Sequence, residues 1–147
     1  MADQVPIGFR LDHAGLAVAD LAAARSWYCE LFGLEPELTL RVEALDLSIE
    51  MLIHPEFGYR VELLCRPGTA GGARKPANPA EAALRAGYGH VAFDVADLDG
   101  AYGRAVAHGA RPVMPPCPAP EPGVRMAFVA DPEGNLIELL HRPGRPQ

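Results

Sequence analysis

Residues 89–98 read Gly-His-Val-Ala-Phe-Asp-Val-Ala-Asp-Leu, and residues 12–21 read Asp-His-Ala-Gly-Leu-Ala-Val-Ala-Asp-Leu. The histidine and the closing Val-Ala-Asp-Leu match at an offset of 77 residues, from 13 to 90. Residues 58–67 and 134–143 also match, because both contain Glu-Leu-Leu-X-Arg-Pro, at an offset of 76 from 62 to 138. Two segments recurring in the same order at nearly one offset indicate two copies of one module.

Each module is predicted to fold as βαβββ. Asp20 and Asp97 follow an alternating first segment and can cap a helix, because a carboxylate accepts the free amide hydrogens of the first turn. Gly33 and Gly109 are placed to end these helices. The expected strands are 11–18, 37–43, 46–53 and 59–65 in module one, and 89–95, 111–114, 124–130 and 135–141 in module two.

The chain is therefore interpreted as one α+β domain spanning residues 1–147. Module one covers about 11–67, a linker rich in Gly, Ala and Pro covers about 68–87, and module two covers about 88–143. A short helix capped by Asn78 is expected to reach Leu84. Residues 112–122 contain six prolines, which cannot form a central strand, and are predicted to form a stiff loop at an edge or at the mouth of a cleft.

Composition excludes several classes of protein. The 147 residues carry a net charge of −6, and 49% of them are hydrophobic, so neither disorder nor a basic nucleic-acid or membrane surface is indicated. The apolar runs are too short to span a bilayer, and no signal peptide is visible. Cys29, Cys65 and Cys117 form no CxxC pair. We expect a reduced, cytoplasmic protein without a nucleic-acid or membrane partner.

Side-chain alternation predicts a shared metal site. In each module the apolar residues of the first and last strands lie on the face toward the helix, which leaves one histidine and one glutamate on the opposite face. These are His13 and Glu62 in module one, and His90 and Glu138 in module two. A carboxylate in the middle of an apolar strand is unusual, and a salt bridge to Arg60 or Arg142 is the simpler explanation for one alone. All four together favour convergence on one metal ion.

The paired modules with these four residues resemble the vicinal oxygen chelate superfamily, which includes glyoxalase I, methylmalonyl-CoA epimerase, extradiol dioxygenases and fosfomycin- and bleomycin-resistance proteins. The resemblance covers roughly residues 11–143 and is carried by Gly89–Val95 and by Asp131–Leu139, Asp-Pro-Glu-Gly-Asn-Leu-Ile-Glu-Leu. It implies curved mixed sheets around a metal-binding cleft, a homodimer and a small-molecule substrate.

Two imidazoles and two carboxylates suit one divalent ion such as Zn, Ni, Co, Mn or Fe(II). Such an ion stabilises an enediolate, and the resemblance then implies an isomerase or epimerase that shifts a proton next to a carbonyl. The substrate is expected to be a small hydroxy-carbonyl, sugar-like or thioester compound. The alternatives are a glyoxalase I-like lyase, a ring-cleaving dioxygenase and a non-catalytic drug-binding resistance protein.

The resemblance implies two catalytic residues, Glu50 and Glu138. The stretch Ser48–Pro55 resembles one in methylmalonyl-CoA epimerase, where such a glutamate and the counterpart of Glu138 are the two bases. The matching position in module two, at an offset of 76, is Met126, and the alternative for Glu50 is an exposed strand carboxylate. His54 is a candidate for substrate contact, whereas His108 and His141 are expected in solvent. Coenzyme A phosphates would need basic partners, for which the candidates are Arg60, Arg66, Arg74, Lys75 and Arg85.

Overall fold

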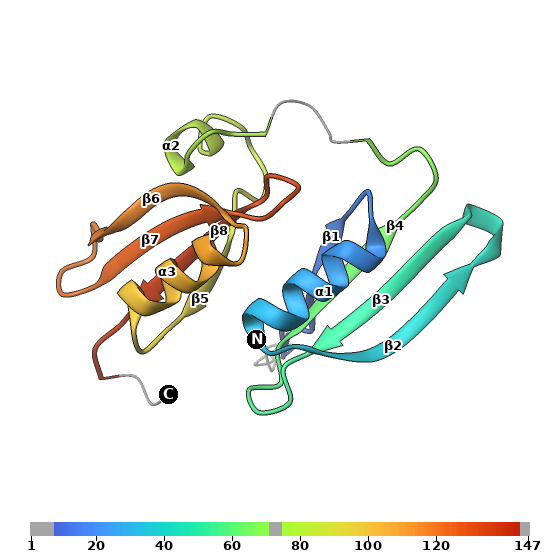
Figure 1. Ribbon diagram of the computed structural model, residues 1–147, viewed down its shortest axis with the longest axis horizontal. Helices are drawn as coiled ribbons and strands as arrows, with labels where there is room; N and C mark the ends of the chain where they lie inside the picture. The colour runs from blue at the N-terminus through green and yellow to red at the C-terminus, as the bar shows by residue number, and fades with distance from the viewer. Residues whose placement is uncertain (1–7, 71–74, 145–147) are drawn as a thin grey trace, which may run out of the picture.

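A computed structural model describes residues 8–70 and 75–144 and shows two βαβββ modules in tandem (Figure 1). The α+β prediction of two such modules is confirmed. Module one consists of β1 (His13–Ala17), α1 (Leu21–Phe32), β2 (Glu35–Val42), β3 (Leu47–Ile53) and β4 (Arg60–Cys65), with a single 3₁₀ turn, η1 (Glu43–Leu45), between β2 and β3. Module two consists of β5 (Val91–Asp94), α3 (Leu98–Ala107), β6 (Arg111–Pro118), β7 (Arg125–Ala130) and β8 (Leu136–His141).

Both modules have the same sheet topology. The strand orders are β1-β4-β3-β2 and β5-β8-β7-β6, so the first strand of each module lies beside its last. The first and last strands run parallel, and the other neighbours run antiparallel. This arrangement places the histidine before or in the first strand next to the glutamate of the last strand.

The two long helices begin and end as their sequences predict. The Ala23 amide donates to Asp20 Oδ1 at 2.9 Å, and the Gly100 amide donates to Asp97 Oδ1 at 3.0 Å. Helix α1 ends at Gly33, whose φ of 65° is a left-handed conformation that glycine adopts without strain. Between the modules, Asn78 caps the short helix α2 (Pro79–Ala82), which ends earlier than expected. Part of the predicted linker, residues 71–74, lies outside the described residues.

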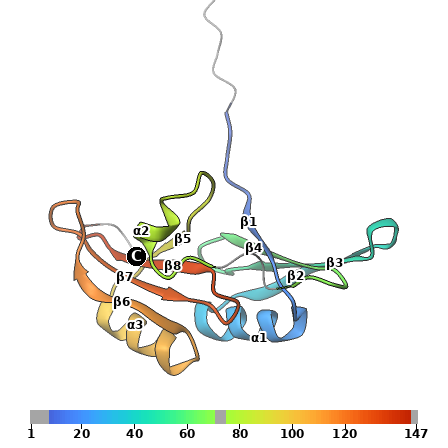
Figure 2. The ribbon, with the colours of Figure 1, turned by 90° about the horizontal axis from the view of Figure 1, so that it is seen from above.

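The molecule has two layers, with α1 and α3 on one side of the sheets and α2 on the other (Figure 2). One core cluster joins the modules, because buried Trp27 and Tyr28 of α1 pack with residues of both sheets. Two side chains of α1 also reach module two: Trp27 Nε1 donates to the His108 carbonyl at 3.0 Å, and the Tyr28 hydroxyl donates to Asp131 Oδ2 at 2.8 Å. None of the helices in the described part of the chain is long and apolar enough to cross a membrane.

The prediction of a loop over residues 112–122 was wrong for residues 112–118, which form a strand, whereas residues 119–122 are irregular. Residues Arg111–Pro118 form β6, which lies at the edge of its sheet and pairs only with β7. The pairing register shifts twice, between Pro112 and Met114 and between Met114 and Cys117. An edge strand tolerates proline because one side of it needs no amide donor, and the register shifts accommodate the rest.

His108 and His141 were expected in solvent, and both are instead half-buried with partners. His108 Nε2 lies 3.4 Å from Glu30 Oε2, and its ring centroid lies 6.4 Å from that of Trp27. His141 Nδ1 lies 3.0 Å from the Val95 carbonyl oxygen. Both residues join neighbouring elements and do not contribute to the candidate site below.

Candidate metal centre

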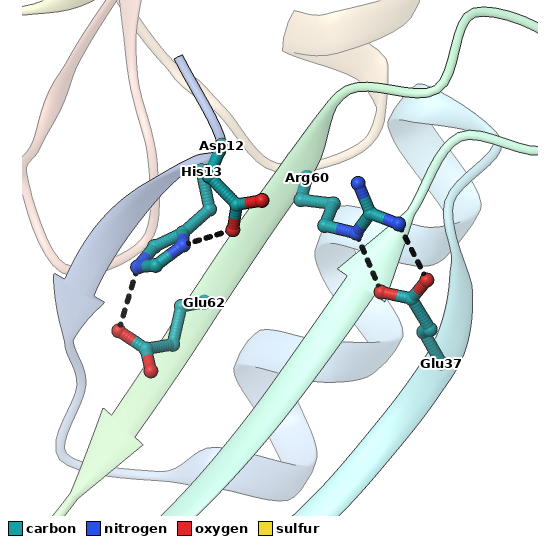
Figure 3. Close-up of polar contacts among 5 residues, drawn as sticks. All are labelled: Asp12, His13, Glu37, Arg60 and Glu62. Atoms are coloured by element: carbon teal, nitrogen blue, oxygen red, sulfur yellow. Dashed lines mark hydrogen bonds and ion pairs between the residues drawn. The ribbon is translucent and has the colours of Figure 1, made fainter. Parts of the chain in front are cut away.

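The first candidate pair lies where β1 begins beside β4. His13 Nε2 is 3.4 Å from Glu62 Oε2, and His13 Nδ1 is 2.8 Å from Asp12 Oδ2 (Figure 3). Both ring nitrogens therefore face a carboxylate oxygen. The next residue on the same face of β1, Gly15, is the register partner of Glu62. A Cβ at Gly15 would lie only 3.2 Å from Glu62 Oε2, so the absence of a side chain leaves room for this carboxylate.

This geometry controls the charge of His13. A neutral imidazole has one donor and one acceptor nitrogen, so it satisfies only one of the two carboxylates. The hydrogen bond to Asp12 accordingly raises the pKa of His13 above its ordinary value of 6.5, and Glu62 acts in the same direction. The same contact lowers the pKa of Asp12. A cation between Nε2 and Glu62 would take the place of one proton, which is how a metal-binding histidine behaves.

The second candidate pair lies where β5 begins beside β8. His90 directly precedes β5, and its Nε2 is 3.1 Å from Glu138 Oε2. The Phe128 ring, on β7, meets the His90 ring edge to face with centroids 5.3 Å apart. Phe128 is also the register partner of Glu138. The second pair is thus bounded by an aromatic wall, and Gly89 occupies the position equivalent to Asp12.

Each pair fits a divalent metal ion as half of a site. Two ligand atoms bound to one ion at about 2.0–2.2 Å each lie roughly 3.0–3.5 Å apart. The Nε2–Oε2 distances of 3.4 and 3.1 Å fall in this range. The structure brings the four predicted ligands together only in pairs, because residues 8–70 and 75–144 contain no group of three or more His, Cys, Asp or Glu side chains placed to hold a metal ion.

Glu50 lies on the other face of the sheet from the first pair. In the antiparallel register Met51 is opposite Glu62, whereas Glu50 is opposite Leu63, a residue of the core. Glu50 is 8% exposed, so the alternative of an exposed strand carboxylate was wrong. Its Oε1 lies 3.4 Å from Arg25 Nη1 of α1, and its Oε2 has no partner in the described part of the chain. The structure does not bring Glu50 together with Glu138, and a shared catalytic role stays a prediction.

The register also corrects the comparison of Glu50 with module two. Met51 and Phe128 are the register partners of Glu62 and Glu138. Met51 and Phe128 are therefore equivalent positions, and so are the residues that precede them. The counterpart of Glu50 is Ala127, not Met126. Ala127 is fully buried on the helix side of its sheet. A buried acid beneath α1 is thus specific to module one.

The arginines expected near the glutamates bind elsewhere. Arg60 makes two hydrogen bonds of 2.7 Å to Glu37 of β2, as Figure 3 shows, and Arg142 pairs with Glu121. Lys75 donates to Asn135 Oδ1 at 2.8 Å, and Arg74 lies outside the described residues. Sequence reasoning missed Asp12 and Phe128. Asp12 could have been found, since it stands next to a candidate ligand, but the place of Phe128 depends on strand register.

Comparisons with known proteins agree with the fold. A family model described as Glyoxalase/Bleomycin resistance protein/Dioxygenase superfamily matches residues 10–139. A glyoxalase family protein from Bacillus cereus is 27% identical, with a TM-score of 0.73, and the match covers 96% of this chain and 97% of that one. The trypanothione-dependent glyoxalase I of Leishmania major is 24% identical, with a TM-score of 0.68 and coverage of 91% and 87%.

A mutant glyoxalase I from Zea mays is 24% identical, with a TM-score of 0.71, and the match covers 90% of this chain but 44% of that one. The chain therefore spans less than half of the maize protein. No curated protein matches the sequence. At these identities the maize and Leishmania structures support the fold alone, so the activity has to be argued from the residues of the site.

Proposed function

The chain belongs to the Glyoxalase/Bleomycin resistance protein/Dioxygenase superfamily, and on that premise we propose that it is a divalent-metal-dependent isomerase or glyoxalase-like lyase. It moves a proton next to a carbonyl group of a small hydroxy-carbonyl compound. His13, Glu62, His90 and Glu138 hold the ion, and Glu138 is the residue that moves the proton. The observation that carries this proposal is the repeated His–Glu pair at ligand spacing on the same face of both sheets.

A second copy of the chain completes the metal site in this proposal. Within one chain, pair one (His13 and Glu62) and pair two (His90 and Glu138) do not meet. In a dimer with twofold symmetry, pair one of each copy would meet pair two of the other copy, which gives two identical metal sites. The face that carries the first pair has apolar surface for such contact. Leu38 and Leu40 of β2 are 48% and 46% exposed there, and Leu38 is the register partner of Met51, which itself lies beside Glu62.

The ion supplies Lewis acidity, which stabilises negative charge as it develops on a substrate oxygen. Glu138 is assigned to proton transfer because its side chain is largely buried beside Phe128, on the apolar side of the proposed site. Phe128 also restricts water on that side of the substrate. Glu62 lies in the more polar pair, near Asp12 and Arg60, and is assigned to binding rather than proton transfer.

A small substrate fits the placement of the basic residues better than an acyl-CoA thioester. Arg60 and Lys75 are engaged with Glu37 and Asn135. Binding of several phosphate groups depends on cations gathered at one place, and neither of these two is free to join such a group. We therefore propose the hydroxy-carbonyl class over the thioester class.

Complementation between two inactive variants tests the shared site. His13→Ala and His90→Ala each remove one ligand from every site in a homodimer. When the two variants are unfolded together and refolded as a mixture, half of the dimers are mixed, and each mixed dimer regains one site with all four ligands. About a quarter of the wild-type metal content and activity is expected to return.

The controls define the outcomes. Each variant refolded alone should stay below a few per cent of wild-type metal, and a mixture of His13→Ala with Glu62→Gln should not recover, because both changes lie in pair one. Activity is followed by incorporation of solvent deuterium next to the carbonyl of candidate substrates. Failure of the first mixture to regain metal, while wild-type protein binds it stoichiometrically, would overturn the shared site. Absence of metal from wild-type protein would overturn the proposed function itself.

A further inference from the structure

A groove lies between the two modules and is lined mainly by residues other than the four candidate metal ligands. The first strands of the modules, β1 and β5, lie near each other but pair only with β4 and β8, so no backbone hydrogen bonds close the space between them. The resulting groove has a volume of about 750 Å³. This volume falls in the range of roughly 300–1,000 Å³ that small-molecule sites occupy, and such sites favour junctions between structural units.

The groove is lined mainly by apolar and aromatic side chains on the helix side of the sheets. Phe93 of β5 stacks on Phe32 of α1 with centroids 4.5 Å apart and lies 5.5 Å from the Tyr59 ring. Phe57 stands at the rim and is 59% exposed. Exposed aromatic surface next to a concave apolar wall favours a flat, apolar ligand.

One cation at the groove has no counter-ion in the structure. Arg104 of α3 lines the groove, and its guanidinium makes no hydrogen bond or ion pair within residues 8–70 and 75–144. The other lining arginine, Arg60, is held by Glu37. The lining acid Asp94 accepts the Arg142 amide, and Asp12 is bound to His13. Arg104 is therefore the cation available to an incoming anion.

We propose that this groove binds a small aromatic carboxylate, with its ring among Phe57, Tyr59 and Phe93 and its carboxylate on Arg104. The proposal goes beyond the metal-dependent function and does not depend on it. Glu62, His90 and Glu138 do not line the groove, and His13 reaches it only where β1 begins. A molecule bound there would contact both modules and hold them in one relative position.

Binding of 2-naphthoate tests the proposal. The sole tryptophan, Trp27, reports on the groove, because its ring lies 5.9 Å from that of Phe32. Titration in the presence of a chelator should change Trp27 fluorescence with a 1:1 stoichiometry and a Kd below about 1 mM, the affinity expected for a probe of this size. Uncharged 2-naphthylmethanol should bind more weakly.

Two arginine variants separate a built site from general charge attraction. Arg104→Gln should weaken 2-naphthoate binding by about tenfold or more, since it removes a charge-assisted hydrogen bond, and should leave 2-naphthylmethanol unchanged. Arg111→Gln is the matched control, because Arg111 is also exposed and without a partner in the described residues but lies outside the groove. Absence of saturable binding at 1 mM, equal losses in both variants, or binding that requires added metal would each overturn the proposal.

Discussion

The two His–Glu pairs occupy equivalent positions in two copies of one fold, yet their surroundings differ. Pair one has polar surroundings: Asp12 holds the His13 ring, Gly15 leaves space beside Glu62, and Arg60 lies nearby on the same face. Pair two is bordered by an aromatic ring, because Phe128 meets the His90 ring edge to face and is the register partner of Glu138. Gly89 and Ala92 stand where pair one has Asp12 and Gly15.

This difference favours separate roles for the two pairs in the proposed site. A histidine oriented by a carboxylate is a better metal ligand, because the tautomer and the ring orientation are set before the ion arrives. A glutamate flanked by an aromatic ring is shielded from water on that side. Pair one is therefore suited to capturing the ion and pair two to chemistry on the substrate.

The largest effect is expected from removing one histidine. His90→Ala and His13→Ala should each lower metal affinity by about 100-fold or more, because one direct ligand is lost from the same ion. Neither change should unfold the protein, since both side chains lie on the face away from the core that Val18 and Leu139 help to form. Metal content after dialysis and the thermal unfolding midpoint measure the two effects. Loss of metal in only one variant would show that the two pairs do not share an ion.

The next largest effect on metal affinity is expected from substitution of Asp12 or Gly89, the residues that directly precede the two histidines. Asp12→Asn should lower metal affinity by about 10–100-fold, the usual consequence of losing a carboxylate that orients a metal-binding histidine. Gly89→Asp should raise the affinity, since it supplies the missing carboxylate to pair two. Competition against a chelating dye measures both. Equal affinities for the wild type and Asp12→Asn would mean that the two pairs are equivalent despite their surroundings.

Much of the fold and of the candidate site was predictable from the sequence. The repeat, the helix caps at Asp20 and Asp97 and the face of each glutamate follow from local rules about spacing and alternation, and the structure has them. The four candidate ligands were selected in this way as one joint site, and the structure brings them together as two pairs. Whether the pairs meet depends on how whole modules or whole chains pack, and a strand pattern carries no information about that.

The mistakes have a physical origin as well. The counterpart of Glu50 was expected at Met126 and is Ala127, because a shift of one residue in strand register changes which residues correspond, and composition does not reveal the register. The prolines of β6 argued against a strand, and only its position at the sheet edge makes them acceptable. His108 and His141 found partners through tertiary contacts 78 and 46 residues away in the chain, between positions 30 and 108 and between 95 and 141.

The tyrosines of the two helices, Tyr28 of α1 and Tyr102 of α3, are expected to contribute differently to stability. Tyr28 of α1 donates to the buried carboxylate of Asp131 in module two, and burial raises the Tyr28 pKa far above its ordinary value, so the hydroxyl stays a donor. Tyr28→Phe should lower the free energy of unfolding by about 1.5–3 kcal/mol, as for other hydrogen bonds to charged groups. Tyr102→Phe on α3 should change it little, because its hydroxyl has no partner in the described residues. Urea denaturation of both variants measures the difference.

The smallest effect concerns the charge of pair one in metal-free protein. His13 should titrate above 6.5 in an NMR experiment, because its hydrogen bond to Asp12 favours the protonated ring. Since the pKa is raised in the folded state, this contact contributes stability that is fully present below pH 6.5 and is lost as the pH rises through the folded pKa. Asp12→Asn should lower the His13 pKa, and Asp99→Asn, which breaks the distant pair with Arg125, should not.

The same titration sets the pH dependence of metal binding. A metal ion must displace the proton that Nε2 shares with Glu62, so affinity should rise with pH until His13 is neutral and then level off. In Asp12→Asn the rise should end at a lower pH, although the final affinity is weaker. Metal titrations at several pH values test this directly. A pH profile unchanged by Asp12→Asn would mean that the metal does not compete with the His13 proton, and pair one would then not be a metal ligand.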